Sequence, residues 1–338
     1  MPIHPARFYQ KLNDDRLQCR LCPRGCVLKP GERGFCFGRQ NIGGELVLTT
    51  YGKSSGFAVD PIEKKPLYHF LPGSEVLSFG TIGCNLGCNF CQNWRISRAR
   101  EELALREPAD PDAIAFRARE AGIPSVAFTY NEPIVFAEYV MDTAAACHRL
   151  DIKTVAVTAG YITKNAQEDF FRNIDAANVD LKSFRDDFYQ RLCGASLKPV
   201  LDTLVFLKHK TSVWLEVTNL IIPEENDSKQ EVTEMCRWIA AELGTEVPVH
   251  FSAFHPDYQL TDTTWTTEAT LRQARKIALD SGIKFVYTGN VSDDEGSSTY
   301  CPECGKPVIE RRGFMVTGRS VHDGKCAFCR TAIAGVFG

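Results

Sequence analysis

The sequence has no long hydrophobic run and no marked excess of charge of either sign, and both absences restrict what the chain can do. No apolar stretch reaches the roughly 18 residues that a membrane span requires, and no apolar segment follows a basic one at the start. The 39 Lys and Arg residues nearly balance the 42 Asp and Glu residues, so the chain offers no broad field for nucleic acid or anionic lipid. We therefore expect a cytoplasmic protein without a membrane or nucleic-acid partner.

Internal repeats, low-complexity tracts and charge blocks are also absent, whereas cysteine is abundant. A cytosolic chain of 338 residues can bury its core without disulfides, so 14 cysteines indicate metal binding or catalysis. Eleven of them fall in three short blocks, which are Cys19, Cys22, Cys26 and Cys36; Cys84, Cys88 and Cys91; and Cys301, Cys304, Cys326 and Cys329. The isolated Cys147, Cys193 and Cys236 are assigned no function, because a lone cysteine is more often a small buried hydrophobe.

Between the second and third blocks, short β-branched or aromatic runs alternate with segments of helical period. This alternation predicts repeated βα units and a parallel sheet. Seven strands are predicted, at residues 75–80, 125–129, 154–158, 178–181, 213–218, 249–253 and 285–288. One helix is expected to begin at Asp110 and Pro111, and another to end at Gly282. We predict an α/β fold with a partial or complete parallel (β/α) barrel at 71–296, a Cys-rich metal-binding region at 1–70 and a four-Cys appendage at 297–338.

Polar residues follow the ends of the predicted strands. They are Cys84, Asn131, Glu132, Thr158, Asp180, Lys182, Glu216, Thr218, Asn219, His255 and Asn290. The carboxyl ends of parallel barrel strands form the rim that carries the chemistry of such folds. Any one of these residues is explained by an ordinary loop, but their recurrence over seven units favours a single active-site mouth.

The central block, C-x3-C-x2-C, supplies three thiolates within one loop. A structural zinc or a ferredoxin-type [4Fe–4S] cluster takes four protein ligands, so three leave one iron open to a substrate or cofactor. Gly83 and Gly87 allow the backbone to wrap closely around a cluster. The alternative, a zinc site completed by a histidine such as His255, needs a ligand from a separate loop.

This spacing, with the aromatic Phe90 before the last cysteine, is typical of radical S-adenosylmethionine (SAM) enzymes. The segment TIGCNLGCNFCQNW, followed by FTYNEP, VTAGYI, VDLKSF, EVTNLIIP and AFHPDY, resembles the AmmeMemoRadiSam-system radical SAM enzymes. These are relatives of pyruvate formate-lyase-activating enzymes. The likeness covers nearly the whole chain, including the N-terminal LCPRGC and the C-terminal CPECG.

The resemblance implies that Cys84, Cys88 and Cys91 hold a [4Fe–4S] cluster whose open iron is chelated by SAM. One electron would then cleave SAM to a 5′-deoxyadenosyl radical, which abstracts hydrogen from an unidentified substrate, either a small molecule or a protein. It also implies an electron donor such as flavodoxin or ferredoxin, and AMMECR-like and Memo-like partner proteins.

The same resemblance assigns residues to the cofactor. It places Asn131 and Glu132 of YNEP at the SAM amino group. Further residues expected near SAM or the substrate are Phe90, Thr158, Asp180, Lys182 and His255. The chain departs from the pattern in VTAG, where activating enzymes typically have Asp-Thr-Asn-Gly, which puts any monovalent-cation site of those relatives in doubt.

The two terminal blocks each offer four thiolates, which is a closed ligand shell. The N-terminal block is expected to hold either a second iron–sulfur cluster or a structural zinc. The C-terminal block has two C-x2-C pairs separated by 21 residues, the spacing of a zinc ribbon or rubredoxin-like site, and zinc is favoured over iron.

Two other functions compete with a radical SAM enzyme that acts on a small substrate. The likeness to activating enzymes suggests a glycyl-radical activase that acts on a partner protein. The C-terminal block suggests a zinc-ribbon RNA-modifying protein, although the net charge of −3 and the lack of an RNA-binding module count against it.

Overall fold

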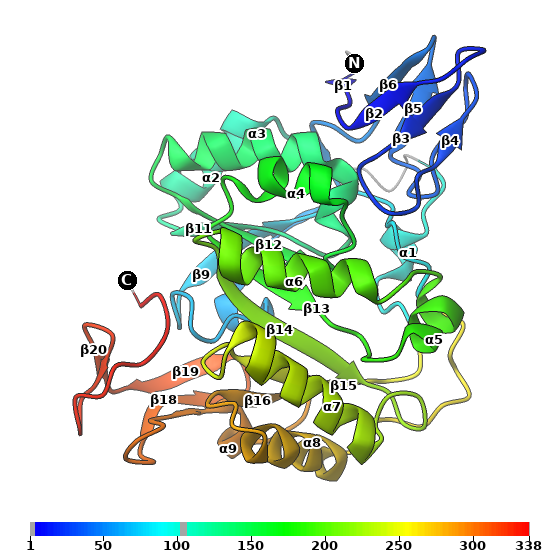
Figure 1. The fold of residues 1–338 in the computed structure, drawn as a ribbon. Helices are drawn as coiled ribbons and strands as arrows, with labels where there is room; N and C mark the ends of the chain where they lie inside the picture. Colours follow the sequence, from blue (N-terminus) through cyan, green and yellow to red (C-terminus); the bar gives the residue numbers. More distant parts are fainter. Residues whose placement is uncertain (1–3, 102–106, 338) are drawn as a thin grey trace.

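A central sheet organises the computed structural model, which describes residues 4–101 and 107–337. In these residues the sheet has eight strands in the order β16-β15-β14-β13-β12-β11-β9-β8 (Figure 1). Their bounds are β8 Phe57–Pro61, β9 Glu75–Phe79, β11 Ser125–Phe128, β12 Lys153–Thr158, β13 Ala176–Asp180, β14 Trp214–Ile221, β15 Val249–Ala253 and β16 Val286–Gly289. Strands β9 to β16 pair in parallel, and β8 is antiparallel to β9.

All seven predicted strands are present, in the predicted parallel arrangement. Consecutive strands are neighbours because a helical crossover joins each to the next. The sheet is open, since within the described ranges no pairing joins β16 to β8. The barrel is therefore a partial one, which decides between the two forms that the sequence allowed.

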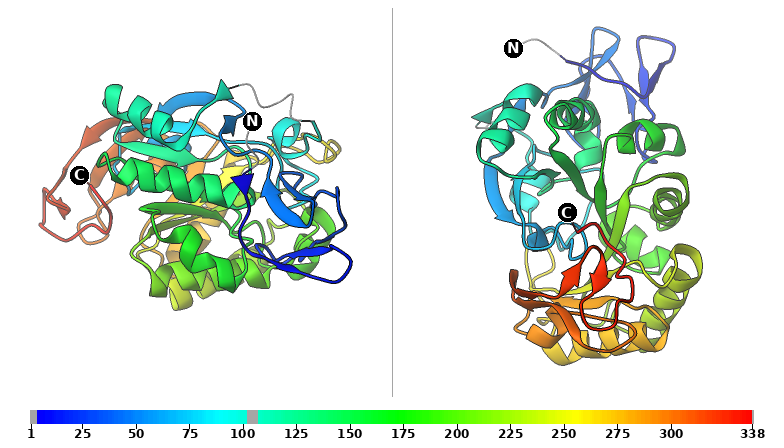
Figure 2. Two further views of the ribbon diagram at one scale, coloured as in Figure 1. Left: turned by 90° about the horizontal axis from the view of Figure 1, so that it is seen from above. Right: turned by 90° about the vertical axis from the view of Figure 1, so that its left-hand side faces the viewer.

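Helices cover the outer face of the sheet (Figures 1 and 2). The longer ones are α2 Pro111–Glu120, α3 Ala137–His148, α4 Lys164–Phe171, α6 Lys198–Lys210, α7 Lys229–Trp238 and α8 Glu268–Asp280. Shorter helical segments are α1 Trp94–Ser97, α5 Asp186–Phe188, α9 Asp294–Ser297, η1 Ile62–Lys64, η3 Pro133–Phe136, η4 Tyr189–Cys193 and η5 Ile239–Leu243. The predicted caps are confirmed: Asp110 accepts from the backbone N–H of Ala113 at 2.8 Å, and α8 ends before Gly282, whose φ is +92°.

The N-terminal segment forms small sheets of its own beside the barrel (Figure 1). Its strands are β1 His4–Pro5, β2 Tyr9–Lys11, β3 Leu17–Cys19, β4 Val27–Leu28, β5 Arg39–Ile42, β6 Glu45–Leu48 and β7 Lys53–Ser54, and β7 pairs with β10 Glu107–Pro108. The boundary predicted at residue 70 is too late, because β8 already belongs to the central sheet. The pairing of β8 with β9 could not be predicted, since the β8 sequence FAVDP has no clear alternation of apolar and polar residues.

The C-terminal segment packs at the amino ends of the barrel strands, away from the cysteine loop that follows β9 (Figure 2). It contains β17 Thr299–Tyr300, β18 Pro307–Arg312, β19 Met315–Arg319, β20 Val321–His322 and β21 Lys325–Cys326. The fully buried Arg311 joins it to the barrel by pairing with Glu63 at 3.3 Å and donating to the carbonyl oxygen of Tyr68 at 2.7 Å. Among the described residues, no helix has the length and apolar character that crossing a membrane requires.

Candidate active site

The loop after β9 carries the central cysteines and is fixed at both ends by contacts with other segments. Gly83 has φ +88°, and a Cβ there would overlap the carbonyl oxygen of Cys36, so glycine is required. The backbone N–H of Gly87 donates to the carbonyl oxygen of Cys193 at 2.6 Å, and that of Asn89 donates to Leu192 at 2.9 Å. The loop is thereby attached to the N-terminal segment on one side and to η4 on the other.

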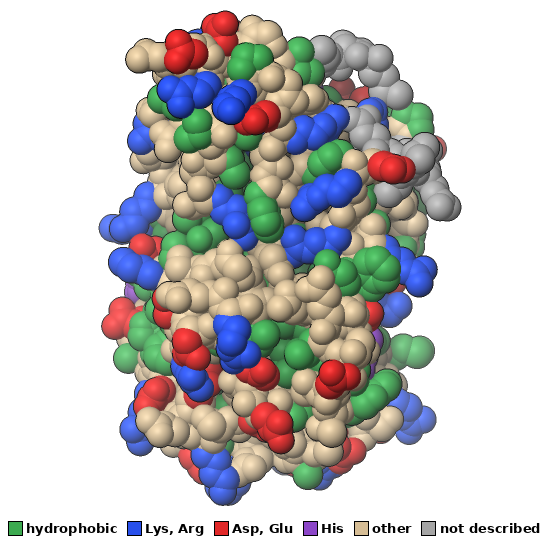
Figure 3. Space-filling model, turned by 90° about the vertical axis from the view of Figure 1, so that its right-hand side faces the viewer, with side chains coloured by type: hydrophobic (Ala, Val, Ile, Leu, Met, Phe, Trp, Pro, Cys, Tyr) green, Lys and Arg blue, Asp and Glu red, His purple; other side chains and the backbone are tan. Residues whose placement is uncertain are grey.

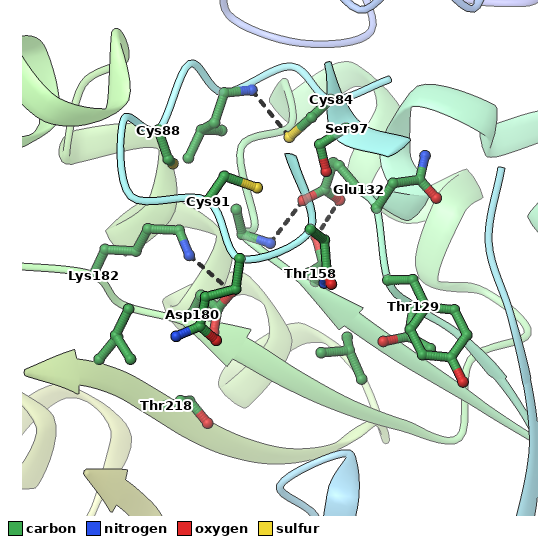
Figure 4. Close-up of a pocket in the computed structure, with 18 of the residues that line it drawn as sticks. Cys84, Cys88, Cys91, Ser97, Thr129, Glu132, Thr158, Asp180, Lys182 and Thr218 are labelled. Carbon is green, nitrogen blue, oxygen red and sulfur yellow. Dashed lines mark hydrogen bonds and ion pairs between the residues drawn. The ribbon is translucent and has the colours of Figure 1, made fainter. Parts of the chain in front are cut away.

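The three cysteines of this loop line one cavity of about 260 Å³ at the carboxyl ends of the strands. Figure 4 shows the sulfurs of Cys84 and Cys91 directed into the space that Glu132, Thr158, Asp180 and Lys182 border from the opposite side. The lining set also includes Phe90, Ser97, Thr129, Tyr130, Asn131, Thr218, Ser252 and Asn290. Most of these residues come from β-strand ends, as expected for the rim of a parallel barrel.

The three thiols sit in different electrostatic surroundings. Burial, together with the nearby Glu132 carboxylate, raises the pKa of Cys84 well above its ordinary value. Burial and the neighbouring Cys88 likewise raise the pKa of Cys91. The hydrogen bond from the Cys193 thiol lowers the pKa of Cys88 to about 7. A bound metal would favour the thiolate at all three positions, because only thiolates ligate.

Asn131 holds the cysteine loop rather than facing the cavity with free polar atoms. Its Oδ1 accepts from the backbone N–H of Thr81 at 2.8 Å, and its Nδ2 donates to the Thr81 hydroxyl at 3.2 Å and to the carbonyl oxygen of Gly83 at 2.9 Å. These three hydrogen bonds occupy both the oxygen and the nitrogen of the side-chain amide. Asn131 therefore positions the residue that precedes Cys84.

Glu132 forms the floor of the cavity with its partners from β12. Its carboxylate accepts from the Thr158 hydroxyl at 2.5 Å, from the backbone N–H of Ala159 at 2.8 Å and from that of Ile134 at 3.1 Å. Burial nevertheless raises the pKa of Glu132 above its ordinary value, and the hydrogen bonds only partly oppose it. A cation placed against this carboxylate would stabilise its charged form.

Lys182 and Asp180 form an ion pair, 3.0 Å apart, on the cavity wall below Cys91 (Figure 4). Burial alone would lower the pKa of Lys182, but the Asp180 carboxylate and the sulfur of Cys88 hold it well above the ordinary value. The ammonium group also lies 6.0 Å from the centre of the Phe90 ring. The wall thus presents both signs of charge to one bound molecule.

Three residues of the expected rim do not line the cavity. The imidazole of His255 lies against Trp265, with ring centres 5.5 Å apart, and no histidine is among the described lining residues. Glu216 lies near the start of β14 and accepts from the backbone N–H groups of Tyr68 and His69, and Asn219 donates to the carbonyl oxygen of Leu181 at 2.7 Å. Glu216 shares a face of β14 with Thr218 but lies nearer the amino end of the strand, whereas Asn219 is on the opposite face.

Comparison with known proteins shows the superfamily of the chain. The sequence profile of the Radical SAM superfamily matches residues 79–239. An uncharacterized protein of Methanocaldococcus jannaschii is 43% identical over 330 residues, which cover 97% of this chain and 98% of that protein. The chain belongs to the radical SAM superfamily. It is an enzyme of that class, and membership implies a [4Fe–4S] cluster and SAM.

Activating enzymes are more distant relatives within the superfamily. The pyruvate formate-lyase-activating enzyme of Clostridium pasteurianum is 26% identical and covers 61% of this chain and 88% of its own length. The crystal structure of a radical SAM methyltransferase from Sphaerobacter thermophilus matches 91% of this chain and 81% of its own, with a TM-score of 0.52 and 16% identity. The structural likeness shows a shared fold only.

The donor set around the cavity fits the cluster and SAM that radical SAM membership implies. Three cysteines of one loop line the cavity. His255 is not among the lining residues, so the zinc alternative has no histidine as its fourth ligand. In the part of the chain that the structure describes, the buried hydroxyl oxygen of Thr218 lines the cavity without a hydrogen-bond partner. This hydroxyl is therefore free to bond a molecule in the cavity.

Sequence analysis did not indicate two of the cavity-lining residues, Ser97 on α1 and Ser252 on β15. Only the position of Ser252 at a strand end could have indicated it, and nothing in the sequence indicated Ser97. Tyr130, a rim residue that follows the second predicted strand, does line the cavity; it has φ +71° and donates from its hydroxyl to Asp60 at 3.1 Å. A strained backbone at a non-glycine residue often marks a functional site.

The C-terminal cysteines converge on one point. The sulfurs of Cys301, Cys304, Cys326 and Cys329 all lie within 4.8 Å of one another. Hydrogen bonding with the side chain and backbone of Thr331 lowers the pKa of Cys329 to about 6, which favours its ligating form. These residues fit a site for a single metal ion.

Proposed function

We propose that Cys84, Cys88 and Cys91 hold the [4Fe–4S] cluster and that the enzyme abstracts a hydrogen atom from a substrate bound in the same cavity. With SAM bound, the cluster supplies one-electron cleavage of the sulfonium and a carbon radical that takes the hydrogen atom. The observation that carries the proposal is that the three cysteines line one cavity with buried polar groups from the strand ends.

The acidic and basic residues of the cavity bind opposite charges of the amino-acid part of SAM. The carboxylates of Glu132 and Asp180 accept from its ammonium group, and the Lys182 ammonium balances its carboxylate. Thr158 fixes the Glu132 carboxylate, and the Phe90 ring supports the apolar side of the site. His255 has no part in this arrangement, because it lies outside the cavity lining.

The open face of the barrel supports an acidic electron donor. Figure 3 looks onto this face, where Lys and Arg side chains gather across the middle. Basic surfaces speed association with acidic partners. We infer a donor of the flavodoxin or ferredoxin class, and AMMECR-like and Memo-like partners follow from the AmmeMemoRadiSam resemblance in the sequence.

The terminal cysteine blocks are proposed to hold metals as well. The convergence of the C-terminal sulfurs supports one zinc ion in a zinc-ribbon-like cap. The N-terminal thiols provide four ligands for either zinc or a second iron–sulfur cluster. The proposed units 1–70, 71–296 and 297–338 follow these sites, except that β8 (Phe57–Pro61) joins the sheet of the barrel.

A glycyl-radical activase is the second candidate function. It is favoured by the 26% identity to the pyruvate formate-lyase-activating enzyme of Clostridium pasteurianum. Its test is incubation of the reduced enzyme and SAM with candidate partner proteins. A glycyl-radical doublet in the EPR spectrum would support it, whereas turnover of a small metabolite without a protein substrate would contradict it.

The experiment that tests the proposed cluster site is EPR spectroscopy of the anaerobically reconstituted and reduced protein. Addition of SAM is expected to change the spectrum of the cluster in the wild type, because SAM occupies the open iron. The Cys88→Ala variant should lose that change, and Cys236→Ala, which removes a buried thiol of α7, should keep it. A SAM-dependent change that persists in Cys88→Ala would overturn the assignment.

A further inference from the structure

The N-terminal cysteines line a cavity at the boundary between the small sheets and the barrel. Cys19 ends β3, Cys22 and Cys26 lie in the turn before β4, and Cys36 precedes β5. The rest of the lining combines apolar and polar groups, namely Leu21, Arg24, Gly34, Arg39, Asn85 and Val135. The cavity therefore belongs partly to the barrel, since Asn85 is in the loop of the catalytic cysteines.

We propose that Cys19, Cys22, Cys26 and Cys36 hold a second [4Fe–4S] cluster that delivers single electrons to the catalytic cluster. The electron-delivery part of this proposal rests on the proposed function of Cys84, Cys88 and Cys91. The alternative, a structural zinc, would hold the fold but carry no electrons.

The separation of the sulfurs distinguishes the two metals. A zinc ion draws four sulfurs to about 2.3 Å from one point, which the C-terminal group satisfies with sulfur pairs 3.5 and 3.8 Å apart. The N-terminal sulfurs do not form a group within 4.8 Å of one another, although all four residues are described. Neither do the three sulfurs of the catalytic loop. A cluster places several irons between its thiolates and needs this wider spacing.

The surroundings also suit a buried anionic cluster. Arg39 is 1% exposed and pairs with Glu138, yet its Nε has no hydrogen-bond partner among the described residues. Arg39 lines the same cavity as the four cysteines, so its Nε can donate to a thiolate or an inorganic sulfide of a cluster bound there.

The N-terminal cavity adjoins the catalytic loop through direct backbone contact. The carbonyl oxygen of Cys36 lies against the Cα of Gly83, the residue before Cys84, so closely that no side chain fits between them. On the other side, the Arg24 guanidinium donates to the carbonyl oxygen of Asn85, the residue after Cys84. Both neighbours of one catalytic ligand are therefore held by the N-terminal site.

The backbone contact between Cys36 and Gly83 lets an electron pass from one site to the other. Cys22, Cys26 and Cys36 are all half-buried, and of the four cysteines Cys36 is the one whose backbone lies against the catalytic loop. One electron enters from a donor of the flavodoxin class and reduces the N-terminal cluster from the 2+ to the 1+ state. The same electron then returns that cluster to 2+ and reduces the catalytic cluster from 2+ to 1+. No bond forms or breaks in this transfer.

The first test is the metal content of the variant in which Cys84, Cys88 and Cys91 are all replaced by alanine. After anaerobic reconstitution it is expected to lose half of the roughly eight irons of the wild type and to keep a [4Fe–4S] Mössbauer spectrum that SAM does not alter. Two zinc ions per chain and no iron would overturn the proposal. If the variant instead keeps all of the wild-type iron, the catalytic assignment is wrong while the N-terminal one stands.

The second test follows the electron. In a Cys22→Ala/Cys26→Ala variant, reduced flavodoxin should reduce the catalytic cluster at least tenfold more slowly than in the wild type, while SAM still changes its EPR spectrum. Because that variant could lose its fold, the fully reduced wild type provides an independent measurement. Its EPR spectrum should show magnetic coupling between two clusters. An unchanged reduction rate or two uncoupled spectra would contradict the electron relay.

Discussion

The Nδ2 atom of Asn131 donates to the carbonyl oxygen of Gly83 at 2.9 Å, which joins the end of β11 to the start of the cysteine loop. The same side chain bonds Thr81 through both of its polar atoms. Asn131 was expected to contact SAM. In the structure its side chain instead holds the backbone just before Cys84. The cluster site depends on this contact as much as on the sulfurs.

Asn131→Ala is therefore expected to impair cluster retention. Loss of three hydrogen bonds from a buried amide should lower the free energy of unfolding by roughly 1–3 kcal/mol and loosen the loop. Iron content after anaerobic desalting measures retention. Asn178→Ala is the control, because Asn178 is another buried asparagine of the sheet, bonded to the carbonyl oxygen of Pro66 at 2.7 Å. Equal iron in the two variants would refute this role.

Lys182→Met should slow SAM cleavage without loss of the cluster. Its removal leaves Asp180 unpaired on the cavity wall, and a lost charged hydrogen bond of about 1.5–3 kcal/mol corresponds to about tenfold or more in rate. The rate of 5′-deoxyadenosine formation and the iron content measure the two effects. Lys198→Met, which removes an exposed lysine paired with Asp202 at 2.8 Å, should change neither. Wild-type cleavage by Lys182→Met would show that the ammonium group does not contact SAM.

The stability of the protein should fall as the pH drops from 6.5 to 4. Burial lowers the pKa of His69 from 6.5 to about 4, so in this range the unfolded chain binds a proton that the folded chain does not. At 1.36 kcal/mol per pKa unit, the free energy of unfolding falls by at most about 3 kcal/mol over this range. Burial would raise the pKa of Glu216, but its hydrogen bonds to His250 and the backbone of Tyr68, together with the nearby imidazoles, hold that pKa below 4.5. Glu216 therefore affects stability mainly below this pH range.

Thermal unfolding of the wild type and of His69→Gln over this pH range measures the effect. In the wild type, the His69 ring contacts the carbonyl oxygen of Ala334 and the hydroxyl of Tyr287. The variant loses stability at neutral pH but should show a flatter pH dependence. A slope equal to that of the wild type would exclude His69 as its source.

Removal of the C-terminal metal should destabilise the cap while sparing SAM cleavage. Cys304 and Cys329 are exposed, so a chelator reaches the site, and the cap packs at the end of the barrel opposite the cysteine loop. Zinc content should fall by about one per chain in Cys304→Ser, and the unfolding temperature should fall with it. Cys147→Ala, which changes a buried thiol of α3, should keep the zinc. Unchanged unfolding in Cys304→Ser would contradict a structural metal.

The sequence was sufficient to predict the parallel strands and the cavity that contains Cys84, Cys88 and Cys91. The strand-end positions of Glu132, Thr158, Asp180 and Lys182 also indicated residues that line this cavity. Both features follow from the local order of residues, namely the hydrophobic period of each segment and the place where a strand gives way to a loop.

The failures all involve long-range packing or side-chain direction. Glu216 follows the rim pattern in the sequence and shares a face of β14 with Thr218. It lies nearer the amino end of the strand, however, where it accepts from the backbone N–H groups of residues 68 and 69. Cys193, which the sequence left without a role, lies against Cys88 because η4 supports the cysteine loop. The contact of Cys36 with Gly83 joins residues 47 positions apart, and no local pattern indicates it.

The most direct test of the central claim is the formation of 5′-deoxyadenosine and methionine from SAM by the anaerobically reconstituted, dithionite-reduced protein. The wild type and Cys147→Ala are expected to form both products. Cys84→Ala is expected to form neither, because one of the three cysteines that line the cavity is gone. Cleavage of SAM by Cys84→Ala at the wild-type rate would contradict the assignment of these cysteines to the catalytic cluster.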